Sequence, residues 1–298
     1  MLRPPSFVYW AGLSRHGILL FPGSIGRYHA SLDSYYRSGG HRRSEGDESE
    51  LIDAGRRNWH AGLPEAPADL LNGTTFQLTR HEAEYLRERF VTRVDRSMLA
   101  WALQHPADLQ GRHAPWQHPR IGEAPPELRN VVEQGERFSL LMYGAVLAYN
   151  AAMAELAAAR GHQEPTLADE YRASYVEWVE QRIEPRLGEL RDWDRGELWR
   201  LVSAMLHGRI GRTRDFSERW MTAVIARPKD AFDDPATRSL IAAREREMKG
   251  QLARLHNPRT LERWNGRSGV YELTYRWGQG RTVLQDIASG LRASGAAD

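Results

Sequence analysis

The 298-residue sequence contains no cysteine. This excludes disulfide bonds, thiolate metal ligands, cysteine nucleophiles and iron–sulfur ligation, and it agrees with a reducing cytoplasm, where we expect the protein to reside. No uninterrupted apolar run approaches the roughly 20 residues that span a bilayer. The apolar stretch near the N-terminus is broken by Arg15 and His16, unlike the continuous core of a signal peptide. We therefore expect no membrane partner.

Lysine is almost absent, because only Lys229 and Lys249 occur and every other basic residue is arginine. High genomic GC content explains this as well as phosphate recognition by guanidinium groups does. The net charge is only +2, but it is unevenly distributed. Residues 164–200 hold six basic and ten acidic side chains, whereas residues 201–298 hold seventeen and eleven. An acidic middle is therefore followed by a basic C-terminal third.

Several catalytic signatures are missing as well. The chain has neither a G-x-x-x-x-G-K-[ST] loop nor a G-x-S-x-G elbow, and its one helical His-Glu pair lacks the second histidine of a zinc protease. His105, His113 and His118 share a loop, but their spacing matches no known ligand set and no carboxylate is fixed nearby. We therefore assign no catalytic residue, no metal site and no cofactor.

Apolar residues recur at helical spacing through nearly the whole chain, with the longest pattern from about residue 125 to 160. Thr79 and Glu82 predict a capping box, and Pro235 and Pro258 stand where prolines begin helices. Extended structure is expected only as short pieces at 18–21 and 270–275. The pattern predicts an all-α fold, a multi-helix bundle with long loops and at most a small β-ribbon.

Composition divides the chain into three parts. Residues 1–37 form an N-terminal helical unit, and residues 59–298 form the main helical domain. Between them, residues 38–58 mix both charge signs with glycine and almost no large apolar residue, which is typical of a linker or an exposed loop.

The stretch REREMKGQLARLHNPRTLERWNGRSG, residues 244–269, carries seven basic and three acidic side chains. A helical projection predicts an apolar stripe comprising Leu240, Ile241, Met248, Leu252 and Leu255. Arg244 falls inside this stripe. Because a guanidinium does not lose its proton, Arg244 either extends to the edge of the core or organises a buried polar network or pocket.

Arginines alternate with aromatic residues from here to residue 281, as in surfaces that neutralise phosphate and stack on bases. The alternative is that the rings belong to the core and the arginines are their solvated neighbours. The predicted contact residues for nucleic acid or a protein partner are Arg246, Lys249, Arg254, Arg259, Arg263, Trp264, Arg267, Arg276 and Trp277.

Several segments, among them RFSLLMYGAVLAYN, WDRGELW, SERW and the stretch just quoted, resemble a bacterial domain-of-unknown-function family, number six-three-six-one. The resemblance covers essentially the whole chain. It implies a longer typical member, so we expect this chain to lack an N-terminal portion. Relatives lie beside helicase-like and phospholipase-D-like genes, which implies anti-phage defence or DNA processing with other subunits as partners.

Three functional hypotheses follow. The first is a non-catalytic component that binds nucleic acid or a partner through residues 244–281. The second is a hydrolase or nuclease whose site is assembled from distant helices, with Arg244, His207 and the acids around Asp192 as candidates. The third is a structural subunit, for which a large exposed apolar patch would be the sign.

Overall fold

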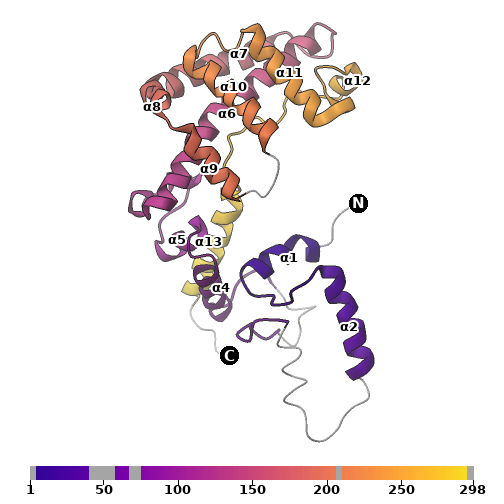
Figure 1. Cartoon of the computed structure of the whole chain (residues 1–298), viewed down its shortest axis with the longest axis vertical. Coiled ribbons are helices and arrows are strands. Elements are labelled where there is room, and N and C mark those ends of the chain that lie inside the picture. The colour runs from indigo at the N-terminus through magenta and orange to yellow at the C-terminus, as the bar shows by residue number, and fades with distance from the viewer. Residues whose placement is uncertain (1–4, 40–57, 67–74, 206–209, 294–298) are drawn as a thin grey trace, which may run out of the picture. The chain divides into compact units, whose positions relative to one another are not determined.

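A computed structural model of the chain describes residues 5–39, 58–66, 75–205 and 210–293 (Figure 1). Its regular elements are helices, which confirms the predicted all-α class. In the described residues the only β pairing is an isolated antiparallel bridge between Leu19 and Trp59, within the short extended piece expected at 18–21. Residues 270–275 form no ribbon.

The chain forms two compact units. Unit 1 comprises residues 1–113, 117–124 and 276–298, and unit 2 comprises residues 114–116 and 125–275. Most of the expected linker, residues 40–57, lies outside the described residues, so the predicted boundaries at 37 and 58 stay predictions.

Unit 1 contains α1 (Pro5–Arg15), α2 (Ile25–Gly39), α4 (Arg80–Arg93), α5 (Met98–Gln104) and α13 (Trp277–Arg292). The predicted capping box begins α4, where the Thr79 side chain accepts from the Glu82 amide and Glu82 accepts from the Thr79 amide. Helices α4 and α13 pack together. Gly290 permits the close approach, because a Cβ there would lie 2.7 Å from that of Ala83.

His118 is one of the most buried polar residues of unit 1, at 2% exposure. Its ring lies between those of Trp101 and Trp277, with centroids 4.8 and 6.5 Å away. The Arg120 amide donates to Nδ1 over 3.3 Å. Burial above all, with the nearby charges of Arg120 and His105, lowers the pKa of His118 below its ordinary value. Burial therefore favours the neutral form of this imidazole in the folded protein.

Unit 2 is built around α6 (Pro126–Ala158), with α7, α9, α10 and α11 packed against it (Figure 1). The bounds of these and the remaining helices are α7 Thr166–Trp178, α8 Leu187–Asp192, α9 Arg195–Met205, α10 Gly211–Ala226, α11 Pro235–Lys249 and α12 Pro258–Leu261. Helix α6 is long and apolar enough to cross a membrane by length and composition alone. The most apolar part of this helix, however, is mostly buried inside the protein.

Two tryptophans lock neighbouring helices to α6. Trp178 of α7 donates its indole hydrogen to the Leu140 carbonyl over 3.2 Å, and Trp220 of α10 donates to that of Leu141 over 2.8 Å. The Trp178 ring occupies the space beside Gly144, where an added Cβ would lie 2.3 Å from the ring. Glycine at this point lets α7 approach the centre of α6.

We predict that Gly144→Ala destabilises the protein by about 1–3 kcal/mol, because the methyl group forces Trp178 out of its packing and off its hydrogen bond. Gly188→Ala is the matched control. Nothing lies within 4 Å of a Cβ at that exposed helical position, so the greater helix propensity of alanine stabilises it slightly. Chemical denaturation measures both changes, and equal effects of the two substitutions would contradict the packing account.

A second prediction concerns acid stability. Because the folded-state pKa of His118 lies below its ordinary value of 6.5, the unfolded chain takes up a proton first as the pH falls. The contribution of His118 to the free energy of unfolding is thus complete above pH 6.5. It is lost as the pH falls from 6.5 through the pKa that His118 has in the folded protein. Unfolding free energies measured at pH 7.5 and 5.5 should differ less in His118→Asn than in the wild type. His113→Asn, at an exposed position of the same loop, should keep the wild-type difference.

Candidate nucleic-acid interface

Helix α11 begins as predicted, with Pro235 in its first turn and Asp234 as the N-cap, whose side chain accepts from the Thr237 amide. It ends at Lys249 because Gly250 takes a positive φ of 52°. The predicted apolar stripe is wrong at two of its five positions. Met248, still within α11, is 66% exposed, and Leu252, after the break in the helical period, is 68% exposed. Leu240 and Ile241 are buried as predicted, and Leu255 packs against the core.

The buried polar anchor of this end of unit 2 is Glu245, only 6% exposed. Its carboxylate accepts hydrogen bonds from the amides of Arg254 and Leu255, both over 2.9 Å, and from the Tyr149 hydroxyl. Burial acts to raise the pKa of Glu245, but these bonds together with Lys249 outweigh it and lower the pKa below its ordinary value. The carboxylate remains charged and ties the turn after α11 to α6.

Two of the predicted contact cations already have partners within unit 2. Lys249 is exposed, but its ammonium donates to the Tyr149 hydroxyl over 2.7 Å and lies 3.2 Å from the Glu245 carboxylate. It also lies 4.9 Å from the centre of the Tyr149 ring. Arg254 is half-buried, and its guanidinium donates to the Ser268 hydroxyl over 3.0 Å. We therefore do not count these two among the unpaired cations.

Side chains of α6 and α7 hold the main chain of the glycine-containing turn at residues 264–269 through hydrogen bonds. The fully buried Asn150 of α6 donates to the Ser268 carbonyl over 2.9 Å and accepts from the Ser268 amide over 2.8 Å. The Tyr171 hydroxyl donates to the Gly266 carbonyl over 2.7 Å. Because α6 and α7 hold the main chain, the side chains of this turn are presented in a fixed position.

The structure corrects the aromatic part of the prediction. Trp264 is 3% exposed and Trp277 is 5% exposed, so neither ring can stack on a ligand, and the core interpretation holds for both. Trp277 donates instead to the Arg112 carbonyl over 3.0 Å. The predicted contact residues also divide between the two units, because the chain passes from unit 2 to unit 1 between Tyr275 and Arg276. Arg276 is exposed, but it belongs to unit 1.

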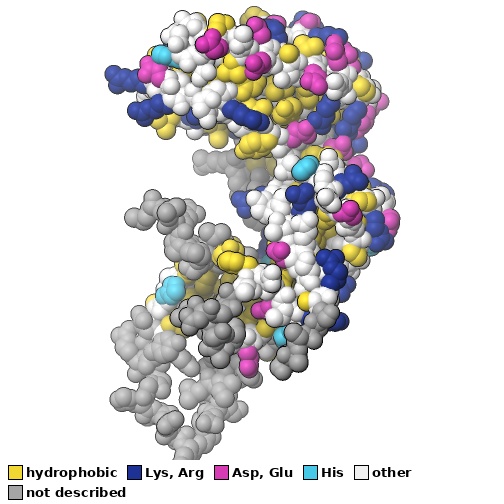
Figure 2. Space-filling view, turned by 180° about the vertical axis from the view of Figure 1, so that it is seen from behind, with side chains coloured by type: hydrophobic (Ala, Val, Ile, Leu, Met, Phe, Trp, Pro, Cys, Tyr) yellow, Lys and Arg dark blue, Asp and Glu magenta, His cyan; other side chains and the backbone are white. Residues whose placement is uncertain are grey.

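Four predicted contact residues of unit 2 are exposed and form no ion pair with any carboxylate of the described residues. They are Arg246, Arg259, Arg263 and Arg267, which we call the arginine surface. Figure 2 shows several Lys and Arg side chains at the end of unit 2 that carries α11 and α12, at the left of that view. The predicted segment thus retains a cationic surface, smaller than expected.

Two of the three acids of the segment are engaged by cations. Glu245 is buried as described, and Glu247 pairs with Arg244 over 2.7 Å and with Arg212 over 3.1 Å. The third acid, Glu262, is exposed and lies 3.7 Å from His162, which pairs with it only when the histidine is protonated. Among the acids of the segment, Glu262 alone therefore opposes the positive charge of the arginine surface.

Arg244 belongs to a polar network at the edge of the core. Besides Glu247, its guanidinium donates to the Thr213 hydroxyl over 2.8 Å and lies 5.7 Å from the centre of the Phe216 ring. Asp192 lies at the exposed end of α8, and His207 falls outside the described residues. In the part of the chain that the structure describes, no three His, Asp or Glu side chains are grouped closely enough to hold a metal ion.

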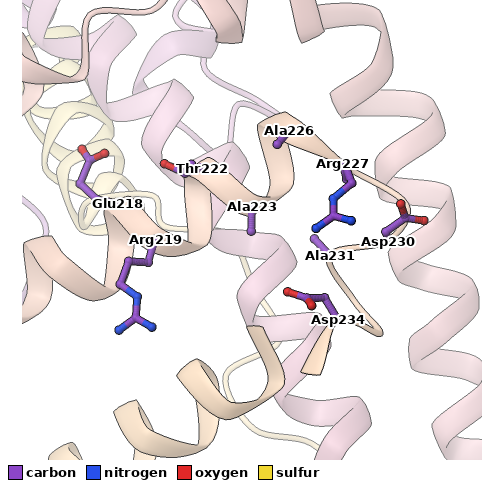
Figure 3. A pocket seen from close by; sticks show the side chains of 9 residues that line it. All are labelled: Glu218, Arg219, Thr222, Ala223, Ala226, Arg227, Asp230, Ala231 and Asp234. Atoms are coloured by element: carbon purple, nitrogen blue, oxygen red, sulfur yellow. The ribbon is translucent and has the colours of Figure 1, made fainter. Parts of the chain in front are cut away.

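A pocket of about 400 Å³ lies between α10 and the turn that leads to α11. Figure 3 shows Arg227, Asp230 and Asp234 around Ala231, with Glu218, Arg219 and Thr222 further along α10. Two arginines and three carboxylates line this pocket, so their formal charges sum to −1. Glu218 is also engaged by the Trp199 indole over 2.5 Å and by Arg195 over 3.1 Å. The mixed charge does not favour phosphate.

These features define an all-α protein of two helical units, one of which carries a cationic surface held in place by a buried carboxylate. The chain belongs to the family of unknown function DUF6361, whose model matches residues 1–290. This confirms the family resemblance seen in the sequence. No curated protein and no solved structure matches the chain.

Sequence reasoning missed Glu245 and Asn150, which position the arginine surface without belonging to it. A signal existed for Glu245, because it lies four residues after Ile241 and so on the apolar face of α11. A carboxylate in that position needs donors, as was argued for Arg244. No comparable signal marks Asn150, whose partner lies 118 residues away.

We predict that Glu245→Ala lowers the free energy of unfolding by about 2–4 kcal/mol, because two buried amides and the Tyr149 hydroxyl lose their acceptor. Glu247→Ala, on the exposed side of the same helix, is the matched control and should change stability little. Denaturant titration of both variants provides the measurement. If Glu245→Ala were no more destabilised than Glu247→Ala, Glu245 would not be the anchor.

Proposed function

We propose that the arginine surface of unit 2 binds the phosphate backbone of a nucleic acid. The observation that carries this proposal is the presence of four exposed guanidinium groups without a carboxylate partner in a segment where two of the three acids pair with other cations. Several other arginines of unit 2, such as Arg172, Arg186 and Arg238, form ion pairs with carboxylates. Unpaired guanidinium groups are the groups that displace counterions from a polyanion.

The positioning of the four arginines supports the same conclusion. Arg267 extends from a turn whose main chain is bonded to α6 and α7, and Arg246 lies in the last turn of α11, which Glu245 anchors. Contacts made from a fixed main chain lose less conformational entropy on binding than contacts made from a loose tail. Tyr271, which is 71% exposed, offers a ring for stacking on an unpaired base.

We further propose a bacterial and cytoplasmic setting, in which the protein is a non-catalytic component of a defence or DNA-processing gene system. This part rests on the family resemblance and on the absence of cysteine. Other subunits of such a system are the second class of partner that we propose. The exposed apolar side chains of Met248 and Leu252 offer contact area for a protein of this kind.

We predict that charge reversal of the arginine surface, Arg246→Glu, Arg259→Glu, Arg263→Glu and Arg267→Glu together, weakens duplex and single-strand binding at least about 100-fold. It should also make the slope of log K against log salt less steep by about three to four for a duplex. Fluorescence anisotropy with labelled oligonucleotides over a salt series measures both quantities.

The matched control reverses four other exposed arginines that lack an ion pair, Arg15, Arg96, Arg191 and Arg227, and so changes the net charge equally. It should keep most of the wild-type affinity. Equal loss in both quadruple variants would mean that only net charge matters. Wild-type binding that does not respond to salt would rule out the phosphate contact.

A further inference from the structure

Unit 1 contains a cavity of about 900 Å³ that the nucleic-acid proposal does not use. It lies between α13 on one side and the end of α5 with its following loop on the other, and Arg87 of α4 and His118 also line it. The volume is at the upper end of the range of about 300–1,000 Å³ that is typical of small-molecule sites. A cavity of this size is large enough for a ligand with a flexible chain.

The cavity has a mixed lining of apolar and polar side chains. Leu103 and Leu109 contribute from the α5 side, and Leu284 and Ile287 contribute from α13. All four belong to the buried core of unit 1, with exposures of 8% or less, so they offer little free surface themselves. The apolar lining residues that are more exposed are Pro106, Ala107, Ala288 and Leu291. Apolar walls that rest on a packed core stabilise a bound apolar chain without having to be ordered first.

Among the described residues that line the cavity there is no Phe, Tyr or Trp, and the imidazole of His118 is the only aromatic ring. A nucleobase or another flat ligand would therefore find no Phe, Tyr or Trp face on which to stack. An alkyl chain needs only dispersion contacts and removal from water, which Leu and Ile supply. The lining therefore favours a chain-like ligand over a planar one.

Two cations line the same cavity. Arg87 and Arg292 are exposed, and neither pairs with a carboxylate of the described residues. Arg292 makes only a 3.4 Å hydrogen bond to the Ser289 hydroxyl, beside it in the lining. The one acid in the lining, Asp108, already accepts from the Gln110 amide over 2.9 Å. The formal charges of Arg87, Arg292 and Asp108 therefore sum to +1 in the lining of this cavity.

We propose that this cavity binds a single-chain amphiphile with an anionic head group. The alkyl chain lies against the partly exposed Pro106, Ala107, Ala288 and Leu291, which rest on the buried leucines and Ile287. The carboxylate or phosphate head meets Arg87 or Arg292. A guanidinium recognises such a head group through charge-assisted hydrogen bonds. The site is in unit 1, and the arginine surface belongs to unit 2.

The test uses the full chain and three probes, measured by isothermal titration calorimetry below micelle-forming concentrations. Dodecanoate carries both the chain and the head group, dodecanol carries only the chain, and acetate carries only the head group. We expect dodecanoate to bind at least about tenfold more tightly than dodecanol, and acetate not to bind detectably. Absence of dodecanoate binding, or equal affinity for dodecanol, would overturn the proposal.

Variants separate the two halves of the site. Arg87→Ala with Arg292→Ala should remove the preference for dodecanoate and change dodecanol affinity by less than about twofold. Ala288→Trp fills the cavity and should abolish binding of both chains, whereas Ala243→Trp, at an exposed position of α11, should have no effect. Ala107→Trp, in the loop after α5, serves if Ala288→Trp does not fold. Unchanged dodecanoate binding in the filled variant would place the ligand elsewhere and refute the site.

Discussion

The Glu245 carboxylate holds three parts of unit 2 in one place, because it accepts bonds from the turn after α11, from Tyr149 of α6 and from Lys249. A buried charge is tolerated only where donors surround it, so the charge dictates the position of each donor. The end of α11, residues 250–255 and the middle of α6 are consequently fixed relative to one another. Arg246, which directly follows Glu245 in the last turn of α11, extends from this fixed segment.

The two units offer different kinds of candidate site. Unit 2 satisfies its buried Glu245 and Asn150, although the Ser139 hydroxyl and the Trp264 indole have no hydrogen-bond partner among the described residues, and its unpaired arginines lie at the surface. Unit 1 buries His118 beside two tryptophans, with no partner for Nε2 among the described residues, and it contains a cavity with a mixed apolar and polar lining. A surface cation attracts a polyanion over a distance, whereas a cavity selects by shape and by removal of water. The two proposed sites therefore differ in their physical basis.

Local rules were sufficient for most of the fold. The capping box at Thr79, the prolines at 235 and 258 and the long apolar pattern of α6 all depend on neighbours within a few residues, and each was placed correctly. The candidate site was harder to predict. Periodicity cannot anticipate that Gly250 takes a positive φ and ends α11, so Leu252 was assigned to the apolar stripe although it is exposed. Met248, within α11, is exposed as well. Alternation of arginine with tryptophan could not reveal that Trp264 is buried against α6 and α7, because that depends on contacts across the fold.

Unit 1 is discontinuous in sequence, since α4 and α5 precede unit 2 and α13 follows it. Helix α4 packs against α13, which is separated from it by more than 180 residues. During synthesis, every helix of unit 2 emerges from the ribosome before α13 does, so unit 2 can complete its core while unit 1 still lacks one wall. The side chains of α4 and α5 that pack against α13 therefore stay uncovered by it until the last part of the chain has been synthesised.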